Sequence, residues 1–114
     1  MKENKFDMAS MSATETDIMN LTMRGCLNYE KYRKCTSDEV EEFVKNDTKR
    51  RLEEWLKANF EEEPISPMVT VTSGYVVLDH RYEKIERVVS TLNIGVLNNK
   101  IEDVHVADFR IEQL

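Results

Sequence analysis

The chain has 114 residues, a formal net charge of −6, 40% hydrophobic residues and 33% charged residues. This length and composition predict one globular domain. The acidic balance argues against direct nucleic-acid binding, which normally needs a basic stripe, and no apolar run approaches the roughly 18 residues of a membrane span.

Residues 1–12 show no hydrophobic period, so we expect a flexible N-terminus ahead of a single domain over residues 13–114. The N-terminal segment also carries acids early and has no apolar core, unlike a secretory signal. Two cysteines in a chain without such a signal indicate a reducing compartment and free thiols. The predicted localisation is cytoplasmic.

A first helix is predicted from about residue 14 or 16 to residue 34, where Ile18, Leu21 and Gly25 recur at steps of three and four. Gly25 costs about 1 kcal/mol relative to alanine inside a helix, so it marks a break or a close crossing. The stretch GCLNYEKYRKC, residues 25–35, contains both cysteines and two of the four tyrosines. We interpret it as the turn between two helices, because the last turn of a helix favours basic residues.

A second helix is predicted from Thr36 to about Phe60. Thr36 and Glu39 match the T-x-x-E capping box, in which the two side chains satisfy amide groups at the helix start. An apolar stripe then recurs at three- and four-residue steps. It consists of Val40, Phe43, Val44, Leu52, Trp55, Leu56 and Phe60.

The second half of the chain predicts a sheet. Residues 67–114 contain 16 Val, Ile and Thr residues, against nine in residues 1–66, and branched side chains pack well on a pleated surface. We expect strands near residues 68–72, 75–79, 85–97 and 104–112, with Ser73-Gly74 as a turn or bulge and residues 98–100 as a hairpin turn. Residues 80–92 also fit a helical period, and this alternative stays open.

The predicted fold is α+β, with two N-terminal helices packed on one face of a three- to four-stranded antiparallel C-terminal sheet. Two prolines, Pro64 and Pro67, mark the connection between the halves. Neither half can bury its apolar face alone, which is why a single domain is expected.

Few residues are suited to catalysis or metal binding. Cys26 and Cys35 are nine residues apart, a wider spacing than in zinc pairs, and only His80 and His105 are present to complete a site. Asp79 and His80 are the best general-base candidate, although neighbours on a strand point to opposite faces. We therefore predict no catalytic residue, no metal and no cofactor. A small enzyme using a histidine–carboxylate pair is the alternative.

The leading hypothesis is a small non-catalytic intracellular module that binds or regulates another protein. It would act through the uncovered face of the sheet or through an edge strand, and an edge strand can also pair with a second copy to form a homodimer. The side chains expected to bind the partner are Val69, Val71, Val76, Val104 and Val106.

A second hypothesis is an acidic inhibitor that mimics nucleic acid and blocks a nucleic-acid-binding protein. The predicted second helix carries Glu41, Glu42, Glu53 and Glu54, whose carboxylates would occupy a basic groove on the partner. The same acids also have an ordinary interpretation, since charged residues keep a helix surface soluble.

Overall fold

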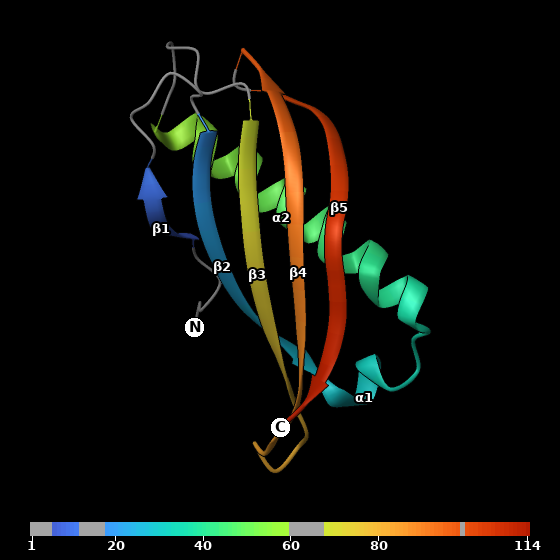
Figure 1. The fold of residues 1–114 in the computed structure, drawn as a ribbon. Helices are drawn as coiled ribbons and strands as arrows, with labels where there is room; N and C mark the ends of the chain where they lie inside the picture. The colour runs from blue at the N-terminus through green and yellow to red at the C-terminus, as the bar shows by residue number, and fades with distance from the viewer. Residues whose placement is uncertain (1–5, 12–17, 60–67, 99) are drawn as a thin grey trace.

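In the computed structural model, the described residues are 6–11, 18–59, 68–98 and 100–114 (Figure 1). The described elements are β1 (Phe6–Met11), β2 (Ile18–Asn28), α1 (Tyr29–Tyr32), α2 (Ser37–Asn59), β3 (Met68–Leu78), β4 (Lys84–Leu97) and β5 (Lys100–Gln113). The described strands form one five-stranded sheet in the order β1-β2-β3-β4-β5. Strands β2 and β3 are parallel, and the other neighbours are antiparallel. The fold is therefore α+β with a mostly antiparallel sheet.

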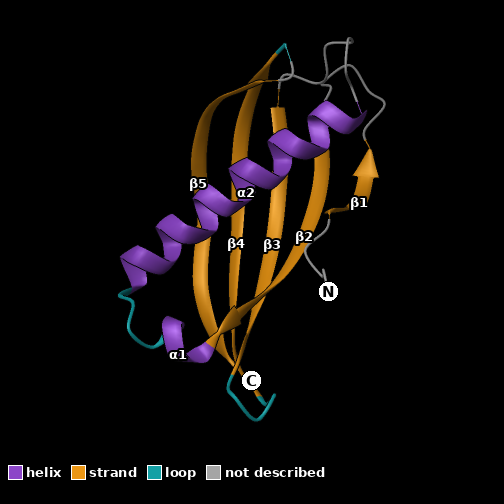
Figure 2. Cartoon of the chain, turned by 180° about the vertical axis from the view of Figure 1, so that it is seen from behind, coloured by secondary structure: helices purple, strands orange, loops and turns teal. Residues whose placement is uncertain are grey.

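Helix α2 connects the two parallel strands and crosses one face of the sheet diagonally (Figure 2). Parallel neighbours need such a crossover, because a short hairpin turn joins only antiparallel strands. The predicted capping box starts this helix. The Glu39 amide donates to Thr36 Oγ1 at 3.2 Å, and the Thr36 amide donates to Glu39 Oε1 at 2.9 Å. The second predicted helix is thus confirmed.

The core lies between α2 and the sheet. From α2 it contains Val40, Val44, Leu52 and Leu56, all buried. From the sheet, the side chains facing α2 alternate with side chains on the opposite face, as the period of a strand requires. The buried apolar ones are Met19, Leu21, Met23, Val69, Val71, Tyr75, Val77, Val88, Leu92, Ile94 and Val96.

The predicted first helix is wrong: residues 18–28 form strand β2, and only residues 29–32 form a helical turn, α1. The helical prediction followed Ile18, Leu21 and Gly25, whereas Met19, Leu21 and Met23 alternate at a period of two and are buried together. Methionine and leucine are good helix formers, and burial against α2 overrides that preference. The stretch at residues 25–35 is therefore the end of a strand followed by α1.

The predicted strands after residue 67 are present but longer. Residues 68–78 form one strand, in which Ser73 and Gly74 stay in register with both neighbouring strands instead of turning. Residues 84–97 are strand, which resolves the open alternative for this part of the chain. The hairpin turn after β4 has positive φ at Asn98, 55°, as expected for asparagine.

Strand β1 was not predicted from the sequence, because its residues show no hydrophobic period. It pairs with β2 from Phe6↔Met23 to Met11↔Met19. The proline-containing connection expected at residues 61–67 lies outside the described residues, as do residues 1–5.

Replacing Leu52, which is 0% exposed, tests the packing of α2 on the sheet. We expect Leu52→Ala to lower the free energy of unfolding by about 2–5 kcal/mol, since it removes apolar contacts and leaves a cavity. Urea denaturation followed by circular dichroism measures this change. The control is Glu53→Ala on the exposed side of the same helix, with an expected change within about 0.5 kcal/mol. Equal effects would mean that α2 is not packed as described.

Candidate functional site

The face of the sheet opposite α2 is a candidate binding surface, and we call it the open face. Among the described residues no helix lies over it (Figure 1). None of its side chains on the central strands β3 and β4 is fully buried, in contrast to their neighbours beneath α2. On β2, β3 and β4 its residues include Thr22, Arg24, Cys26, Thr70, Thr72, Gly74, Val76, Arg87, Val89, Thr91 and Asn93.

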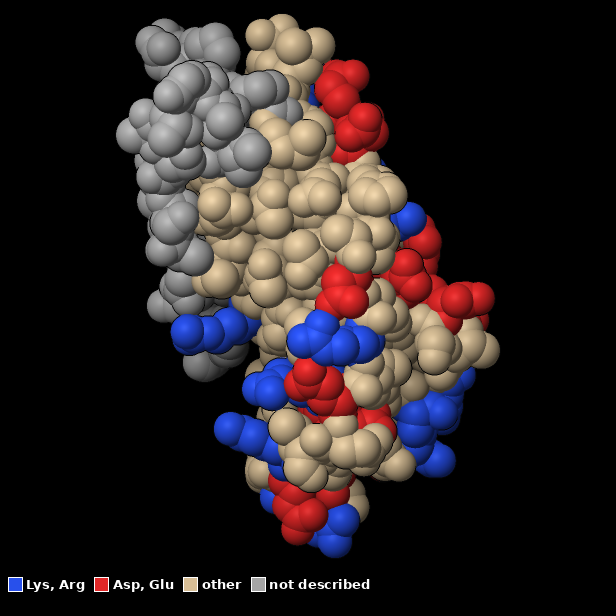
Figure 3. All heavy atoms as spheres, viewed as in Figure 1, with Lys and Arg blue, Asp and Glu red and all other residues tan. Residues whose placement is uncertain are grey.

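The upper part of the open face is uncharged. The strand register aligns Thr22, Thr72 and Thr91 in one row across β2, β3 and β4. Asn20, Thr70 and Asn93 form the next row, in which Thr70 Oγ1 donates to Asn93 Oδ1 at 3.0 Å. We call these six residues the threonine patch. Figure 3 shows a continuous area without charged side chains on this part of the face.

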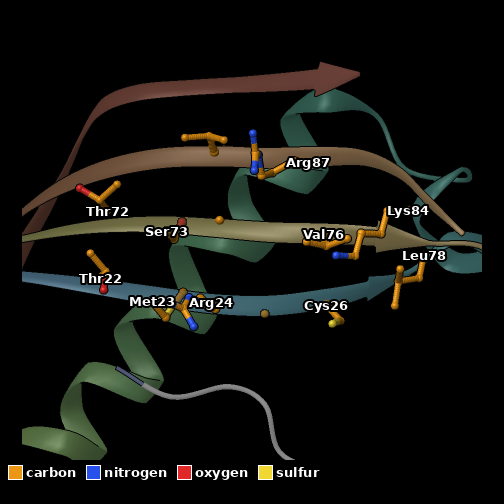
Figure 4. Close-up of a pocket in the computed structure, with 13 residues that line it drawn as sticks. Thr22, Met23, Arg24, Cys26, Thr72, Ser73, Val76, Leu78, Lys84 and Arg87 are labelled. Carbon is orange, nitrogen blue, oxygen red and sulfur yellow. The ribbon is translucent and has the colours of Figure 1, made fainter. Parts of the chain in front are cut away.

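The lower part of the open face is charged (Figure 3). A shallow hollow lies here, and Figure 4 shows side chains around it from β2, β3 and β4. Three of its lining residues are cations: Arg24 on β2, and Lys84 and Arg87 on β4. Glu112 on β5 accepts hydrogen bonds from Arg110 and Arg87, which hold the pKa of its carboxyl below the usual value.

Of the five valines predicted to bind a partner, only Val76 lies on the open face. Val69 and Val71 are 0% exposed and belong to the core, so the prediction that they form a contact surface is wrong. Val104 and Val106 are half-buried and also pack against the core.

Val104 and Val106 were expected on the uncovered face of the sheet. This prediction failed because β5 contains two bulges. The register passes from Thr91↔Asp108 to Leu92↔Val106, and from Gly95↔Asp103 to Val96↔Ile101. Ala107 and Glu102 are thus extra residues, and each reverses the alternation of side chains that follows it. As a result Val104 and Val106 lie on the same side as Phe109 and Ile111, not on the opposite one.

The acids expected on the second helix are present on α2 but do not form a continuous carboxylate array. The helix contains seven acids and five bases. Glu42 lies 3.6 Å from Lys45, and Glu54 lies 3.4 Å from Arg50. Glu41 and Glu53 flank these pairs along the helix. The exposed side of α2 is therefore a mixed surface in which bases partly neutralise the acids.

In the predicted histidine–carboxylate pair, the carboxylate of Asp79 has a structural role. In the turn between β3 and β4, Asp79 Oδ1 accepts the amides of Arg81 and Glu83 at 2.9 and 3.1 Å, and Oδ2 pairs with Arg81 Nη2 at 2.8 Å. Desolvation alone would raise the pKa of the Asp79 carboxyl, but these hydrogen bonds outweigh it and lower the pKa. His80 is exposed, and these hydrogen bonds of Asp79 lie within the turn.

Cys26 and Cys35 are free and exposed, and both line a second, mostly apolar hollow between β2, α1 and α2. Asn28 caps α1 there, its Oδ1 accepting the Glu30 amide at 2.8 Å. Among the residues that the structure describes, no three His, Cys, Asp or Glu side chains gather as metal ligands.

The buried polar groups beneath α2 form a connected cluster. The Tyr75 hydroxyl donates to Asp47 Oδ2 at 2.6 Å, and Arg51 Nη1 donates to the same oxygen at 3.2 Å. Arg51 Nη2 donates to the Arg24 carbonyl of β2 at 2.9 Å. Arg24 follows Met23, which pairs with Phe6 of β1. The side chains of Arg51 and Asp47 are 5% and 11% exposed. This cluster joins α2 to β2 and β3, and no sequence pattern indicated that these residues meet.

The cluster shifts the ionisation of its members. Burial by itself raises the pKa of the Asp47 carboxyl, but hydrogen bonds from Tyr75, Arg50 and Arg51 outweigh burial and leave the pKa below its usual value. For Tyr75, burial and then the hydrogen bond to Asp47 raise the pKa of the hydroxyl. At neutral pH the cluster therefore contains an ionised aspartate, a neutral tyrosine and an arginine cation.

No family model, curated protein or solved structure matches the chain. In the described part of the chain, no helix combines the length and apolar character needed to cross a membrane.

Four residues of the open face were not predicted from the sequence: Thr22, Arg24, Thr72 and Thr91. The two on β2 could have been found from the alternation of polar residues with Met19, Leu21 and Met23.

Asp47→Asn tests the buried cluster. At pH 7 we expect it to lower the free energy of unfolding by about 3 kcal/mol, since Arg51 stays buried beside a neutral amide. The folded pKa of Asp47 lies below the value of about 3.9 for an unfolded aspartate, so its contribution is present above pH 4 and lost as the pH falls. The difference between wild type and variant should therefore shrink between pH 5 and pH 2.5, measured by urea denaturation.

Glu53→Gln is the control for this experiment, because Glu53 is an exposed acid on the same helix. We expect it to follow the wild-type stability within about 0.5 kcal/mol at each pH. A difference between wild type and Asp47→Asn that stays constant down to pH 2.5 would contradict the assignment.

Proposed function

We propose that this protein is a non-catalytic module that binds another protein through the open face of its sheet. The observation that carries the proposal is the contrast between the two faces. Helix α2 covers one face, whereas the other presents six contiguous uncharged side chains, the threonine patch, beside a charged hollow. An uncharged area bordered on one side by charged residues supports protein binding, because the centres of protein interfaces are depleted of charged residues.

The β5 edge of the sheet is less suited to strand addition than the open face. On the outer edge, β5 has two bulges and carries alternating charges, both of which discourage pairing with another strand. On β2, the Arg24 carbonyl next to the end of β1 already accepts Arg51. These features favour docking on the face over edge pairing or an edge-to-edge homodimer.

Neither alternative function gains support from a specific arrangement. Mimicry of nucleic acid needs a continuous negative surface, whereas Glu42 and Glu54 on α2 pair with Lys45 and Arg50. A histidine–carboxylate enzyme needs an oriented base, and Asp79 is engaged with Arg81 and backbone amides. We therefore propose a role in protein association and not in catalysis.

Comparative capture from a lysate of the native source tests the proposal. Thr72→Trp places a bulky side chain in the middle of the threonine patch, on a strand that accepts aromatic residues. Proteins retained by the immobilised wild type should be retained at least tenfold less by this variant, as quantified by mass spectrometry. The reason is steric, because a partner that contacts the patch cannot approach the added ring.

Asn46→Trp, on the exposed side of α2, is the matched control and should retain the same proteins as the wild type. A third variant, Glu42→Lys with Glu53→Lys, separates the alternatives. Loss of capture in that variant but not in Thr72→Trp would favour the acidic mimic. Equal capture by all variants would refute binding through the open face. Circular dichroism confirms that each variant is folded.

A further inference from the structure

The hollow on the open face has an unusual charge for this protein. The chain carries a net charge of −6, yet among the described residues the hollow is lined by the cations Arg24, Lys84 and Arg87 and by no acid. The cations come from two strands separated by β3, and Figure 4 shows them around the same hollow. A local positive region on an acidic protein indicates attraction for a negatively charged group.

Gly74 leaves room at the centre of this region. The strand register places it between Arg24 on β2 and Val89 on β4. A Cβ atom built on Gly74 would have one neighbour within 4 Å outside its own chain neighbours, Arg87 Cδ at 3.9 Å. A glycine inside a strand often marks a place where another chain approaches closely. The space above Gly74 can therefore admit a ligand between the cations.

The acids on the β5 side of the hollow pair with arginines. Glu112 Oε1 accepts Nε and Nη2 of Arg87 at 3.3 and 3.1 Å, and Glu112 Oε2 accepts Arg110 Nε at 2.9 Å. Asp108 accepts Arg110 Nη1. Glu112 is thus shared between Arg110 on β5 and Arg87, which borders the hollow from β4.

We propose that the cationic hollow, Arg24, Lys84 and Arg87 around Gly74, recognises an acidic segment of the partner protein. This proposal rests on the proposed function and adds the chemistry of the partner. Carboxylates of aspartate or glutamate side chains pair with the guanidinium and ammonium groups, and Thr72 borders the hollow with a hydroxyl group. Because these side chains are exposed to solvent, the attraction is weakened by salt.

A protein segment fits this site better than nucleic acid does. In the described part of the chain no aromatic side chain lines the hollow, so bases would lack a stacking platform there. The remaining surface is acidic overall, and an extended polyanion would be repelled beyond the hollow. A short acidic peptide needs only the few cations that are present.

Titration of the full chain with a fluorescent decaglutamate peptide at 50 mM salt tests the proposal. We expect saturable binding that weakens as the salt is raised to 300 mM, and no binding of a glycine–serine decamer. Lys84→Glu should weaken peptide binding by about tenfold, because an attraction becomes a repulsion. Gly74→Leu, which fills the hollow without changing charge, should also weaken it. Lys57→Glu on α2 makes the same change of charge far from the hollow and should bind like the wild type.

Three results would overturn the proposal. One is the absence of decaglutamate binding; another is an equal loss of binding in Lys57→Glu and Lys84→Glu, which would mean that only the net charge matters. The third is tighter binding of a ten-nucleotide thymidine oligomer, which would assign the hollow to single-stranded nucleic acid. If peptide binding fails while Thr72→Trp still abolishes capture from the lysate, the acidic segment is wrong and the protein-binding function stands.

Discussion

The contact between Tyr75, Asp47 and Arg51 is the link that the rest of the structure depends on. Tyr75 lies on β3, Asp47 and Arg51 lie on α2, and Arg51 also reaches the backbone of β2 at Arg24. The cluster thus connects both parallel strands to the helix that joins them in sequence. Apolar packing by itself is compatible with small sliding movements of a helix. Directional hydrogen bonds in a buried place fix where along the sheet α2 lies.

Fixing α2 on one face determines what the other face can present. Alternation along β2, β3 and β4 sends Met19, Val71 and Leu92 beneath α2, and Asn20, Thr72 and Thr91 to the opposite side. The polar side chains on that side let the face contact water without an apolar patch. Hence α2 covers one face of the sheet, and among the described elements no helix covers the other.

The features that the sequence predicted correctly are those that neighbouring residues determine. The capping box at Thr36 and the positive φ of Asn98 were readable because neighbouring residues determine them. Strand β2 was misread because Met and Leu prefer helices, although its alternation was visible. The bulge at Ala107 and the meeting of Asp47 with Tyr75 were not readable, since both depend on how distant segments align. Of the candidate surface, Val76 was anticipated, and the threonine patch was missed with β2.

The central claim is that a protein partner docks on the face opposite α2. Site-specific photo-crosslinking addresses it most directly, with a benzophenone amino acid introduced at Thr91 on the open face or at Lys49 on α2. Irradiation in a lysate of the native source should give a discrete crosslinked product from position 91 and none from position 49. A crosslink to the same protein from position 49 alone would place the partner on the helix and contradict the account.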